Sequence, residues 1–300
     1  MNYKLDSCVK QCELALFFPR KSYLCTPLKL PMKNLLVVLI LVITLASCGS
    51  YQKALKSEDN AVKVAMIDTL FAKGKYGKTL ALFEQIIPAY RGTDSAAPMA
   101  IKYAKALYED QSYINSAYQY ERFIQSHPQD PNAEKALFMA AKSHYQMSPV
   151  YSKDQTDTNT ALTKLQEYIN VYPSGEFLAE ANSLVDELRD KLDKKAYETA
   201  KQYHHFGNFR GGYISAISAF ENFIVDHPGS AYQDDAQFYL LESQYEYGIN
   251  SFPELVPERL AKAKKYYDTF AKRYPNSEYK EDAEMILAKI EDYNSKNISK

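Results

Sequence analysis

Cys48 is the residue of this sequence whose position best suits covalent chemistry, because it follows directly after an apolar run. Residues 35–46 read LLVVLILVITLA, and a methionine and a lysine stand shortly before them. A charged start, a short apolar stretch and small residues before a cleavage point are typical of a secretory signal. Twelve apolar or nearly apolar residues are too few for a membrane-spanning helix, which needs about 20. We therefore expect residues 32–47 to be a signal peptide.

Leu45, Ala46 and Ser47, which directly precede Cys48, resemble the bacterial lipobox. That resemblance implies cleavage before Cys48 and attachment of a diacylglycerol group to its sulfur. The lipid on Cys48 would then hold the protein to a membrane, and residues 48–56 would be the lipidated tether. The alternative is an uncleaved anchor helix, which has no need of the cysteine.

The other three cysteines lie upstream of this signal, within residues 1–31. They are Cys8, Cys12 and Cys25. A metal site is the functional alternative for these thiols, but no histidine is near them. We interpret residues 1–31 as a leader read from before the true start at Met32. No cysteine follows Cys48, so the exported protein has no disulfide and depends on its own core.

The histidines indicate packing rather than catalysis or metal binding. Two of the five histidines directly precede a proline in a repeated motif, and the other two copies of that motif have tyrosine. These four positions are His127, His227, Tyr172 and Tyr274. Exchange with tyrosine indicates a flat packing group. His204 and His205 suggest a metal-binding or pH-sensitive pair, but adjacent helical positions point about 100° apart, which disfavours a shared ion.

Motifs of known catalytic or metal sites are missing from the sequence. It contains no GxSxG, no HExxH and no glycine-rich phosphate loop. Asp154 and Asp157 lack the ligand spacing and closing glutamate of a calcium loop. We therefore expect no enzyme activity, no metal and no cofactor.

The charge of the chain argues against a nucleic acid partner. The whole sequence carries 36 basic and 37 acidic side chains, and without residues 1–47 the net charge is −5. Neutralising phosphates requires clustered lysine and arginine side chains, which an acidic chain does not favour. We expect no nucleic acid binding.

Four segments end alike, each with an aromatic-rich motif closed by a proline. The prolines are Pro128, Pro173, Pro228 and Pro275. Each copy has a small residue twelve positions before the proline, a bulky residue eight before it and an aromatic residue five before it. In chain order these are Ser116, Tyr120 and Phe123; Ala161, Leu165 and Tyr168; Ala216, Phe220 and Phe223; and Ala263, Tyr267 and Phe270. Such steps keep the positions on one helix face, so we expect close helix packing there.

Further helical patterns lie between these segments, at residues 96–110, 132–147, 175–192, 231–248 and 278–293. The arrangement resembles the tetratricopeptide repeat, whose second helix carries a small residue, an aromatic residue and a closing proline. A weaker copy at residues 74–91 ends in arginine instead of proline, as suits a terminal repeat. We predict an all-α fold, a tetratricopeptide-like α-solenoid of about five helix pairs over residues 57–293, followed by a tail at 294–300.

The spacing of the closing prolines predicts insertions between the helices. The intervals are 45, 55 and 47 residues, against about 34 in a tetratricopeptide repeat. We place insertions at residues 147–160 and 250–258, and extra helix within residues 176–205. Three residues stand where helix N-caps are expected, namely Asn132, Ser174 and Ser230.

The tyrosine-rich early repeats suggest a surface for an extended peptide. A solenoid of helix pairs presents a long concave face. In the predicted register the groove-facing residues of the 96–110 helix are Ile101, Lys105, Tyr108 and Glu109. The alternative is that several of these tyrosines are core residues whose hydroxyls reach the rim.

From about residue 52 to 293 the chain resembles the BamD family of outer membrane assembly lipoproteins. The most specific parts are the lipobox, the insertion SPVYSKDQTDTNTA at 148–161 and the segment 197–228. The resemblance implies a lipid-anchored outer membrane protein facing the periplasm, and a non-catalytic scaffold in the machinery that inserts β-barrel proteins. It implies two protein partners. The carboxy-terminal repeats would dock the barrel-forming, BamA-like subunit through its periplasmic domains, and the amino-terminal repeats would receive unfolded outer membrane β-barrel proteins.

Two other functions remain open on the sequence. A periplasmic tetratricopeptide scaffold for cell-wall or division enzymes would use the same repeats, because repeats alone do not name the partner. A glycan-binding surface lipoprotein fits less well, because sugar-binding platforms favour tryptophan and this chain has none.

Overall fold

The computed structural model describes residues 49–298, so the predicted signal peptide and the lipid site at Cys48 lie outside the described residues. The chain divides into two units, residues 1–62 and 63–300. In the described part of the first unit, residues 49–56 are helical, although the sequence predicted a tether there. The second unit contains the repeats.

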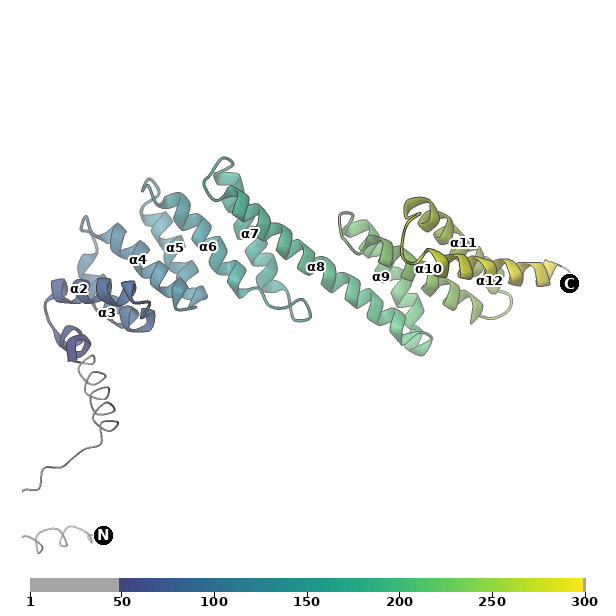
Figure 1. Cartoon of the computed structure of the whole chain (residues 1–300), viewed down its shortest axis with the longest axis horizontal. Helices are drawn as coiled ribbons and strands as arrows, with labels where there is room; N and C mark the ends of the chain where they lie inside the picture. The colour runs from purple at the N-terminus through teal and green to yellow at the C-terminus, as the bar shows by residue number, and fades with distance from the viewer. Residues whose placement is uncertain (1–48, 299–300) are drawn as a thin grey trace, which may run out of the picture. The chain divides into compact units, whose positions relative to one another are not determined.

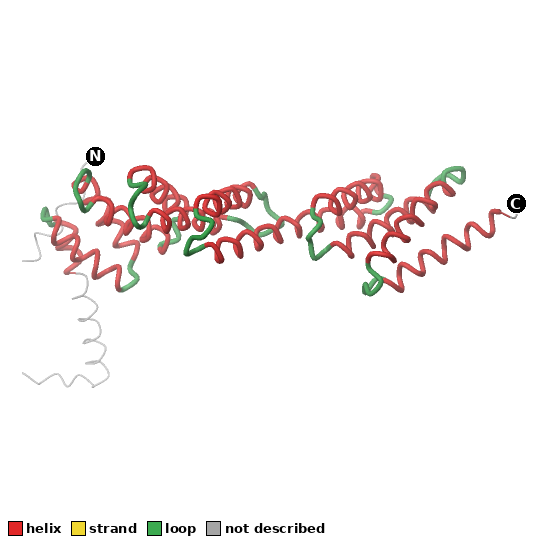
Figure 2. The backbone as a smooth tube through the Cα atoms, turned by 90° about the horizontal axis from the view of Figure 1, so that it is seen from above, coloured by secondary structure: helices red, strands yellow, loops and turns green. Residues whose placement is uncertain are grey.

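The described chain folds into helices separated by short connections (Figure 1). Their bounds are α2 Asn60–Ala72, α3 Tyr76–Tyr90, α4 Ala96–Glu109, α5 Tyr113–Ser126, α6 Ala133–Met147, α7 Thr156–Val171, α8 Leu178–Phe206, α9 Gly212–Asp226, α10 Gln233–Ile249, α11 Val256–Arg273 and α12 Lys280–Ile298, with a short 3-10 turn at Phe209–Gly211. Residues 49–298 contain no strand (Figure 2). The predicted all-α, tetratricopeptide-like solenoid is confirmed, and α12 extends through most of the predicted tail.

Helices of the second unit pack against their neighbours in sequence, from α3 against α4 to α11 against α12. We call α4, α6, α8 and α10 the first helices of their pairs, and α5, α7, α9 and α11 the second helices. The helix α12, which follows the last pair, is counted with the first helices. Among the residues described, no helix is long and apolar enough to cross a membrane.

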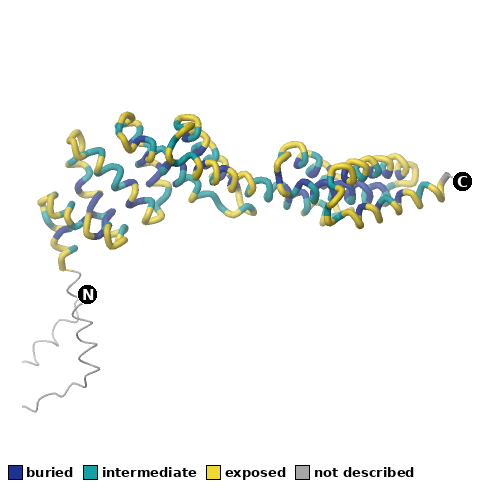
Figure 3. Tube along the Cα trace, turned by 45° about the horizontal axis from the view of Figure 1, so that its top comes forward, coloured by how far each residue is buried: buried dark blue, intermediate teal, exposed yellow. Residues whose placement is uncertain are grey.

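The buried residues lie where successive helices meet (Figure 3). Eleven of the twelve positions in the repeat register are buried, and the twelfth, Tyr267, is partly buried against the same core. Ala161, Ala216 and Ala263 have no exposed surface, which permits close approach of the neighbouring helix. The proline after each second helix then ends it, because proline cannot donate the next helical hydrogen bond.

The long helix α8 belongs to two helix pairs at once. Its first half packs Ala181, Val185 and Leu188 into a core with α6 and α7. Its second half packs Tyr197 and Ala200 into a core with α9 and α10. The extra helix predicted within residues 176–205 is therefore a continuous connection between successive repeats.

Three junctions between repeats are closed by stacked aromatic rings. In each, a ring from a first helix lies flat on the ring that directly precedes the next first helix, with ring centres 4.5–4.7 Å apart. The pairs are Phe138 with Phe177, Tyr197 with Tyr232, and Phe238 with Tyr279. These rings sit four positions after the repeat proline, so the turn itself carries part of the core.

The helix starts after these turns differ from the sequence prediction. Ser174 and Ser230 were expected to be N-caps, but α8 begins at Leu178 and α10 begins at Gln233. The residue at the N-cap is the stacking ring, Phe177 or Tyr232, and its side chain makes no capping hydrogen bond. Packing of the ring has replaced capping at these helix starts.

A carboxylate at the start of a first helix fastens the next turn at two of the junctions. The Glu134 carboxylate accepts hydrogen bonds from the Tyr168 hydroxyl at 3.0 Å and the Glu176 backbone N–H at 2.6 Å. The Tyr168 hydroxyl in turn accepts a hydrogen bond from the Phe177 backbone N–H at 3.0 Å. In the later junction the Asp235 carboxylate accepts hydrogen bonds from two tyrosine hydroxyls, one on α8 and one directly before α12. Partly buried polar groups are thus paired across consecutive repeats.

The Tyr168 hydroxyl should contribute measurably to stability. Tyr168→Phe leaves the Glu134 carboxylate and the Phe177 amide each short of one partner, which costs about 1–3 kcal/mol of unfolding free energy. Tyr172→Phe is the matched control, because within the described residues the Tyr172 hydroxyl has no hydrogen bond, and it should change stability by less than about 0.5 kcal/mol. Urea unfolding of the two variants and the parent measures the difference.

The difference in stability between the parent and Tyr168→Phe should depend on pH. Burial, with the nearby Glu134 carboxylate, raises the pKa of Tyr168 to about 12. A pKa above that of the unfolded chain means that the stabilising effect is complete below about pH 10 and lost as the pH rises toward 12. The difference between parent and Tyr168→Phe should therefore narrow above pH 10. Equal stability of parent and Tyr168→Phe at pH 7 would contradict this account of the junction.

Candidate peptide-binding site

The predicted groove residues lie together on α4, but they differ in how accessible they are. Lys105 and Glu109 are exposed, and Tyr108 is half-buried. Ile101 is partly buried and packs against the core cluster formed with α5 and α6. The surface that α4 offers a ligand is therefore made mainly by Lys105, Tyr108 and Glu109, while Ile101 supports it from beneath.

The same arrangement recurs one repeat later on α6. Phe138, Lys142 and Tyr145 follow the spacing i, i+4, i+7, as do Ile101, Lys105 and Tyr108 on α4, so each trio lines one helix face. We call this side of the first helices the first-helix face. It presents an aromatic ring and a lysine from each of two consecutive repeats.

Contacts across the first-helix face join residues 34–38 positions apart, which is one repeat. Between α2 and α4 the Lys102 ammonium pairs with the Asp68 carboxylate. Between α4 and α6 the Gln146 amide donates a hydrogen bond to the Tyr108 hydroxyl at 3.2 Å. Between α6 and α8 the Lys142 ammonium lies 2.7 Å from a carboxylate oxygen of Glu180. These contacts fix the spacing of the groups that a ligand would meet.

The pKa shifts show which groups are charged on this face at neutral pH. Burial raises the pKa of the Tyr108 hydroxyl. Burial and the Glu187 carboxylate raise the pKa of Tyr145 to about 12. Burial lowers the pKa of Lys142. The hydrogen bond to Glu180 and the neighbouring negative groups raise it by a larger amount, so the net shift of this pKa is upward. The tyrosines are therefore neutral donors and acceptors, and the lysine is a cation, as suits binding of a peptide backbone.

The predicted insertion after α6 is ordered by contacts to α8. The Lys191 ammonium donates a hydrogen bond to the Ser148 hydroxyl at 2.7 Å, and the Lys195 ammonium donates one to the Lys153 carbonyl at 2.5 Å. The Gln155 amide, which is buried, donates to backbone carbonyls within the same segment. The insertion is thus part of the folded repeat unit. Asp154 accepts a hydrogen bond from the Thr156 backbone N–H, which is a turn contact.

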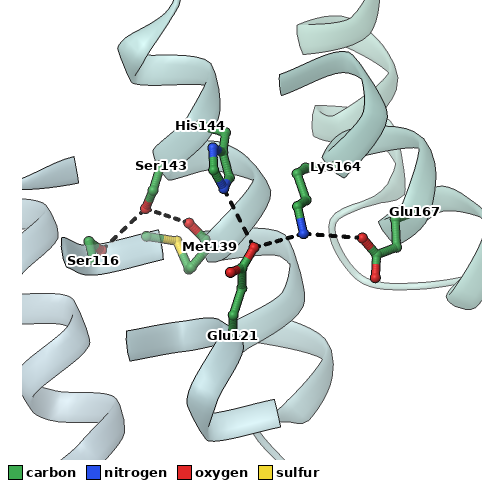
Figure 4. Close-up of polar contacts among 7 residues, drawn as sticks. All are labelled: Ser116, Glu121, Met139, Ser143, His144, Lys164 and Glu167. Atoms are coloured by element: carbon green, nitrogen blue, oxygen red, sulfur yellow. Dashed lines mark hydrogen bonds and ion pairs between the residues drawn. The ribbon is translucent and has the colours of Figure 1, made fainter. Parts of the chain in front are cut away.

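A cluster of polar side chains joins α5, α6 and α7 (Figure 4). The Glu121 carboxylate lies 2.8 Å from the Lys164 ammonium and 3.5 Å from Nε2 of His144. Its hydrogen bond with Glu121 raises the pKa of Lys164. Beside it, the buried Ser143 hydroxyl donates to the Met139 carbonyl at 2.7 Å. These contacts bind three consecutive helices together.

His204 has the neighbours of a catalytic histidine, but its serine is inaccessible. Its Nδ1 lies 2.8 Å from the Ser243 hydroxyl and its Nε2 lies 3.2 Å from the Glu242 carboxylate. Ser243 has no exposed surface, so a substrate carbonyl cannot reach its oxygen. The contact connects α8 to α10. His205, the next residue, is exposed.

The remaining motif histidines pack as flat groups. His127 and His227 lie against the rings of Phe123 and Phe223, with centres 5.4 and 5.0 Å apart. Tyr172 makes the equivalent contact in another repeat. Among the described residues, no group of three or more metal-ligating side chains is close enough to hold an ion. The hydrogen bonds of the Glu134 and Asp235 carboxylates were not predicted from the sequence, because single acidic residues at helix starts are common and give no distinct signal.

Comparison with known proteins finds a family that matches this chain. The sequence profile of the YfiO family, described as outer membrane lipoprotein, matches residues 65–254 and 210–295. Together the two matches span most of the chain and all of the repeats from α3 onward.

Several individual relatives share one name. Proteins named outer membrane protein assembly factor BamD match from Rickettsia prowazekii, at 24% identity over 82% of this chain and 93% of the relative, and from Neisseria meningitidis, at 22% over 72% and 85%. A protein of the same name from Caulobacter vibrioides is 22% identical over 59% of this chain, a match that covers only 57% of that relative.

Proposed function

Because the chain belongs to the YfiO family of outer membrane lipoproteins, we propose that it is a scaffold of the machinery that inserts β-barrel proteins into the outer membrane. The observation that carries the proposal is the family match over residues 65–295, on a fold made of consecutive helix pairs. In this proposal the protein is anchored by lipid on Cys48, faces the periplasm and has no catalytic residue. Its work is to hold other proteins in position.

The proposal assigns the unfolded barrel proteins to the amino-terminal repeats. The first-helix face of α4 and α6 offers lysine, tyrosine and acidic groups at fixed spacing, and tyrosine supplies rigid contact area at low entropic cost. An extended strand of a barrel protein has unpaired backbone groups and apolar side chains on alternate positions. Polar contacts to its backbone groups and apolar contacts to its side chains suit a transient complex.

The proposal assigns the barrel-forming subunit to the carboxy-terminal repeats. Large apolar side chains are exposed in and next to the connections of this half: Phe206 at 50%, Phe209 at 65%, Ile214 at 53% and Phe252 at 76%. Exposed apolar groups of this size are typical of protein interfaces. A periplasmic domain of the barrel-forming subunit is the partner that we assign to them.

Peptide binding tests the amino-terminal assignment. A peptide from the last strand of an outer membrane barrel protein should bind with a Kd of roughly 1–100 µM, as suits transfer to another subunit. Tyr108→Ala should weaken binding about tenfold, which corresponds to about 1.4 kcal/mol. Tyr203→Ala is the control, because this exposed tyrosine lies on the second half of α8. Fluorescence anisotropy measures the affinity of both variants for the peptide. Equal affinity of the two variants would show that Tyr108 is not part of the binding site.

Depletion in cells tests the function as a whole. When the protein is depleted, many outer membrane barrel proteins should fall together, while soluble periplasmic proteins stay constant. Quantitative proteomics of the outer membrane fraction measures this. Constant barrel protein levels together with altered cell-wall crosslinking would favour the alternative of a cell-wall scaffold.

A further inference from the structure

A polar cleft lies between the second half of α8 and the insertion that follows α6. It has a volume of about 470 Å³. The insertion contributes Tyr151 and Ser152 to its lining, and the other lining residues come from α8. Three of these, Lys195, Thr199 and Gln202, follow the spacing i, i+4, i+7, so they lie on one face of α8. The cleft therefore has one wall made by a helix and one made by a turn.

The turn is held against α8 by contacts of its own. The Lys194 ammonium lies 4.7 Å from the centre of the Tyr151 ring. The Lys195 ammonium donates one of its three hydrogens to the Lys153 carbonyl. Within the turn, the buried Gln155 amide donates to three backbone carbonyls. The two walls are thus in place without a ligand, as in most small-molecule sites.

Two lysines of the lining lack a carboxylate partner. Within residues 49–298, neither Lys195 nor Lys201 forms an ion pair. The Lys201 ammonium instead lies 5.5 Å and 4.9 Å from the ring centres of Tyr197 and Tyr239. Both lysines are partly buried, so salt screens their charge less than that of fully exposed lysines. The cleft therefore attracts an anion, although the chain as a whole is acidic.

One carboxylate stands beside these ammonium groups. Among the described residues, Glu198 is the single acidic residue that lines the cleft. A second carboxylate, Asp154, lies outside the lining, and hydrogen bonds from Thr156, with a smaller contribution from Lys195, lower its pKa. Glu198 cannot bind an anion, but its oxygens accept hydrogen bonds from hydroxyl groups. The ligand that complements this lining carries an anionic group and at least one hydroxyl group.

The arrangement of the donors favours phosphate as the anionic group. Besides the two ammonium groups, the lining offers the hydroxyls of Ser152 and Thr199 and the amide of Gln202. These donors come from both walls. The oxygens of a phosphate point in several directions, whereas those of a carboxylate lie in one plane, and lysine binds phosphate as a point charge. Among the described residues, no aliphatic side chain larger than threonine lines the cleft, which disfavours a ligand with an apolar body.

We propose that this cleft binds a phosphorylated polyol, with its phosphate at Lys195 and Lys201 and a hydroxyl group of the polyol at Glu198. Soluble glycerol phosphate and the headgroup of a glycerol-bearing phospholipid share this chemistry. The volume of the cleft lies within the range of small-ligand sites, about 300–1,000 Å³. The proposal does not depend on the proposed function, because no lining residue belongs to the surfaces that we assigned to protein partners.

Binding to the full chain in detergent tests both sources of the ligand. In isothermal titration calorimetry, glycerol 3-phosphate should bind with a Kd of roughly 0.1–1 mM, at least fivefold more tightly than inorganic phosphate, and glycerol should not bind. In native mass spectrometry, phosphatidylglycerol should be retained in preference to phosphatidylcholine, whose headgroup has a phosphate but no hydroxyl group. Binding of either glycerol-bearing ligand supports the proposal and identifies its source, and binding of neither would overturn it.

A pair of double variants separates the cleft from the general effect of charge. Lys195→Gln combined with Lys201→Gln should weaken binding of the glycerol-bearing ligand at least tenfold. Lys272→Gln combined with Lys289→Gln is the matched control, because both lysines are exposed, lie outside the cleft and form no ion pair within the described part of the chain. The control removes the same charge and should bind as the parent does. Unchanged binding in the cleft variant, or an equal loss in the control, would contradict the proposal.

Two single variants guard against a loosened turn. Lys201→Gln leaves the contact from Lys195 to the insertion intact and should still weaken binding at least threefold. Glu198→Gln should narrow the preference for glycerol 3-phosphate over inorganic phosphate, because it removes the acceptor for the hydroxyl group. Circular dichroism checks that each variant is folded. Full affinity of a folded Lys201→Gln variant would overturn the assignment of the phosphate.

Discussion

The stacking of one ring from a first helix on the ring before the next first helix is the contact on which the order of the repeats depends. Each repeat of a solenoid touches only its neighbours, so stability is the sum of the repeats and their junctions. At three junctions the flat ring pairs, together with the buried small residues of the second helices, provide that neighbour contact. The partly buried carboxylates of Glu134 and Asp235 then fix the register of the turn through their hydrogen bonds.

The early repeats lack this ring. At the position of Phe177 in the later junction, the connection before α4 has Ser95 and the connection before α6 has Asn132. The first-helix face lies in this part of the molecule. An apolar cluster of α4, α5 and α6 joins these repeats, and the hydrogen bond from Gln146 to Tyr108 adds a polar contact between two first helices.

The sequence predicted the second helices and their buried faces, because the small residue, the aromatic residue and the proline recur at constant spacing. It also predicted the flat packing of His127 and His227, since tyrosine replaces histidine in the other copies. The stacking rings were missed because they lie in the turn, where no helical periodicity marks them, and Ser174 and Ser230 gave a competing capping signal. Ile101 was placed in the groove, but its side chain also packs into the core, since a helix position at the edge of a face belongs partly to both.

The central claim is that this helical domain serves the assembly of outer membrane barrel proteins by holding the barrel-forming subunit. Affinity purification of the full chain from detergent-solubilised membranes, followed by quantitative mass spectrometry, tests this most directly. The account predicts that the barrel-forming assembly subunit is recovered in an amount comparable to the protein itself. Recovery of cell-wall synthases or surface sugar receptors, without the barrel-forming subunit, would contradict it.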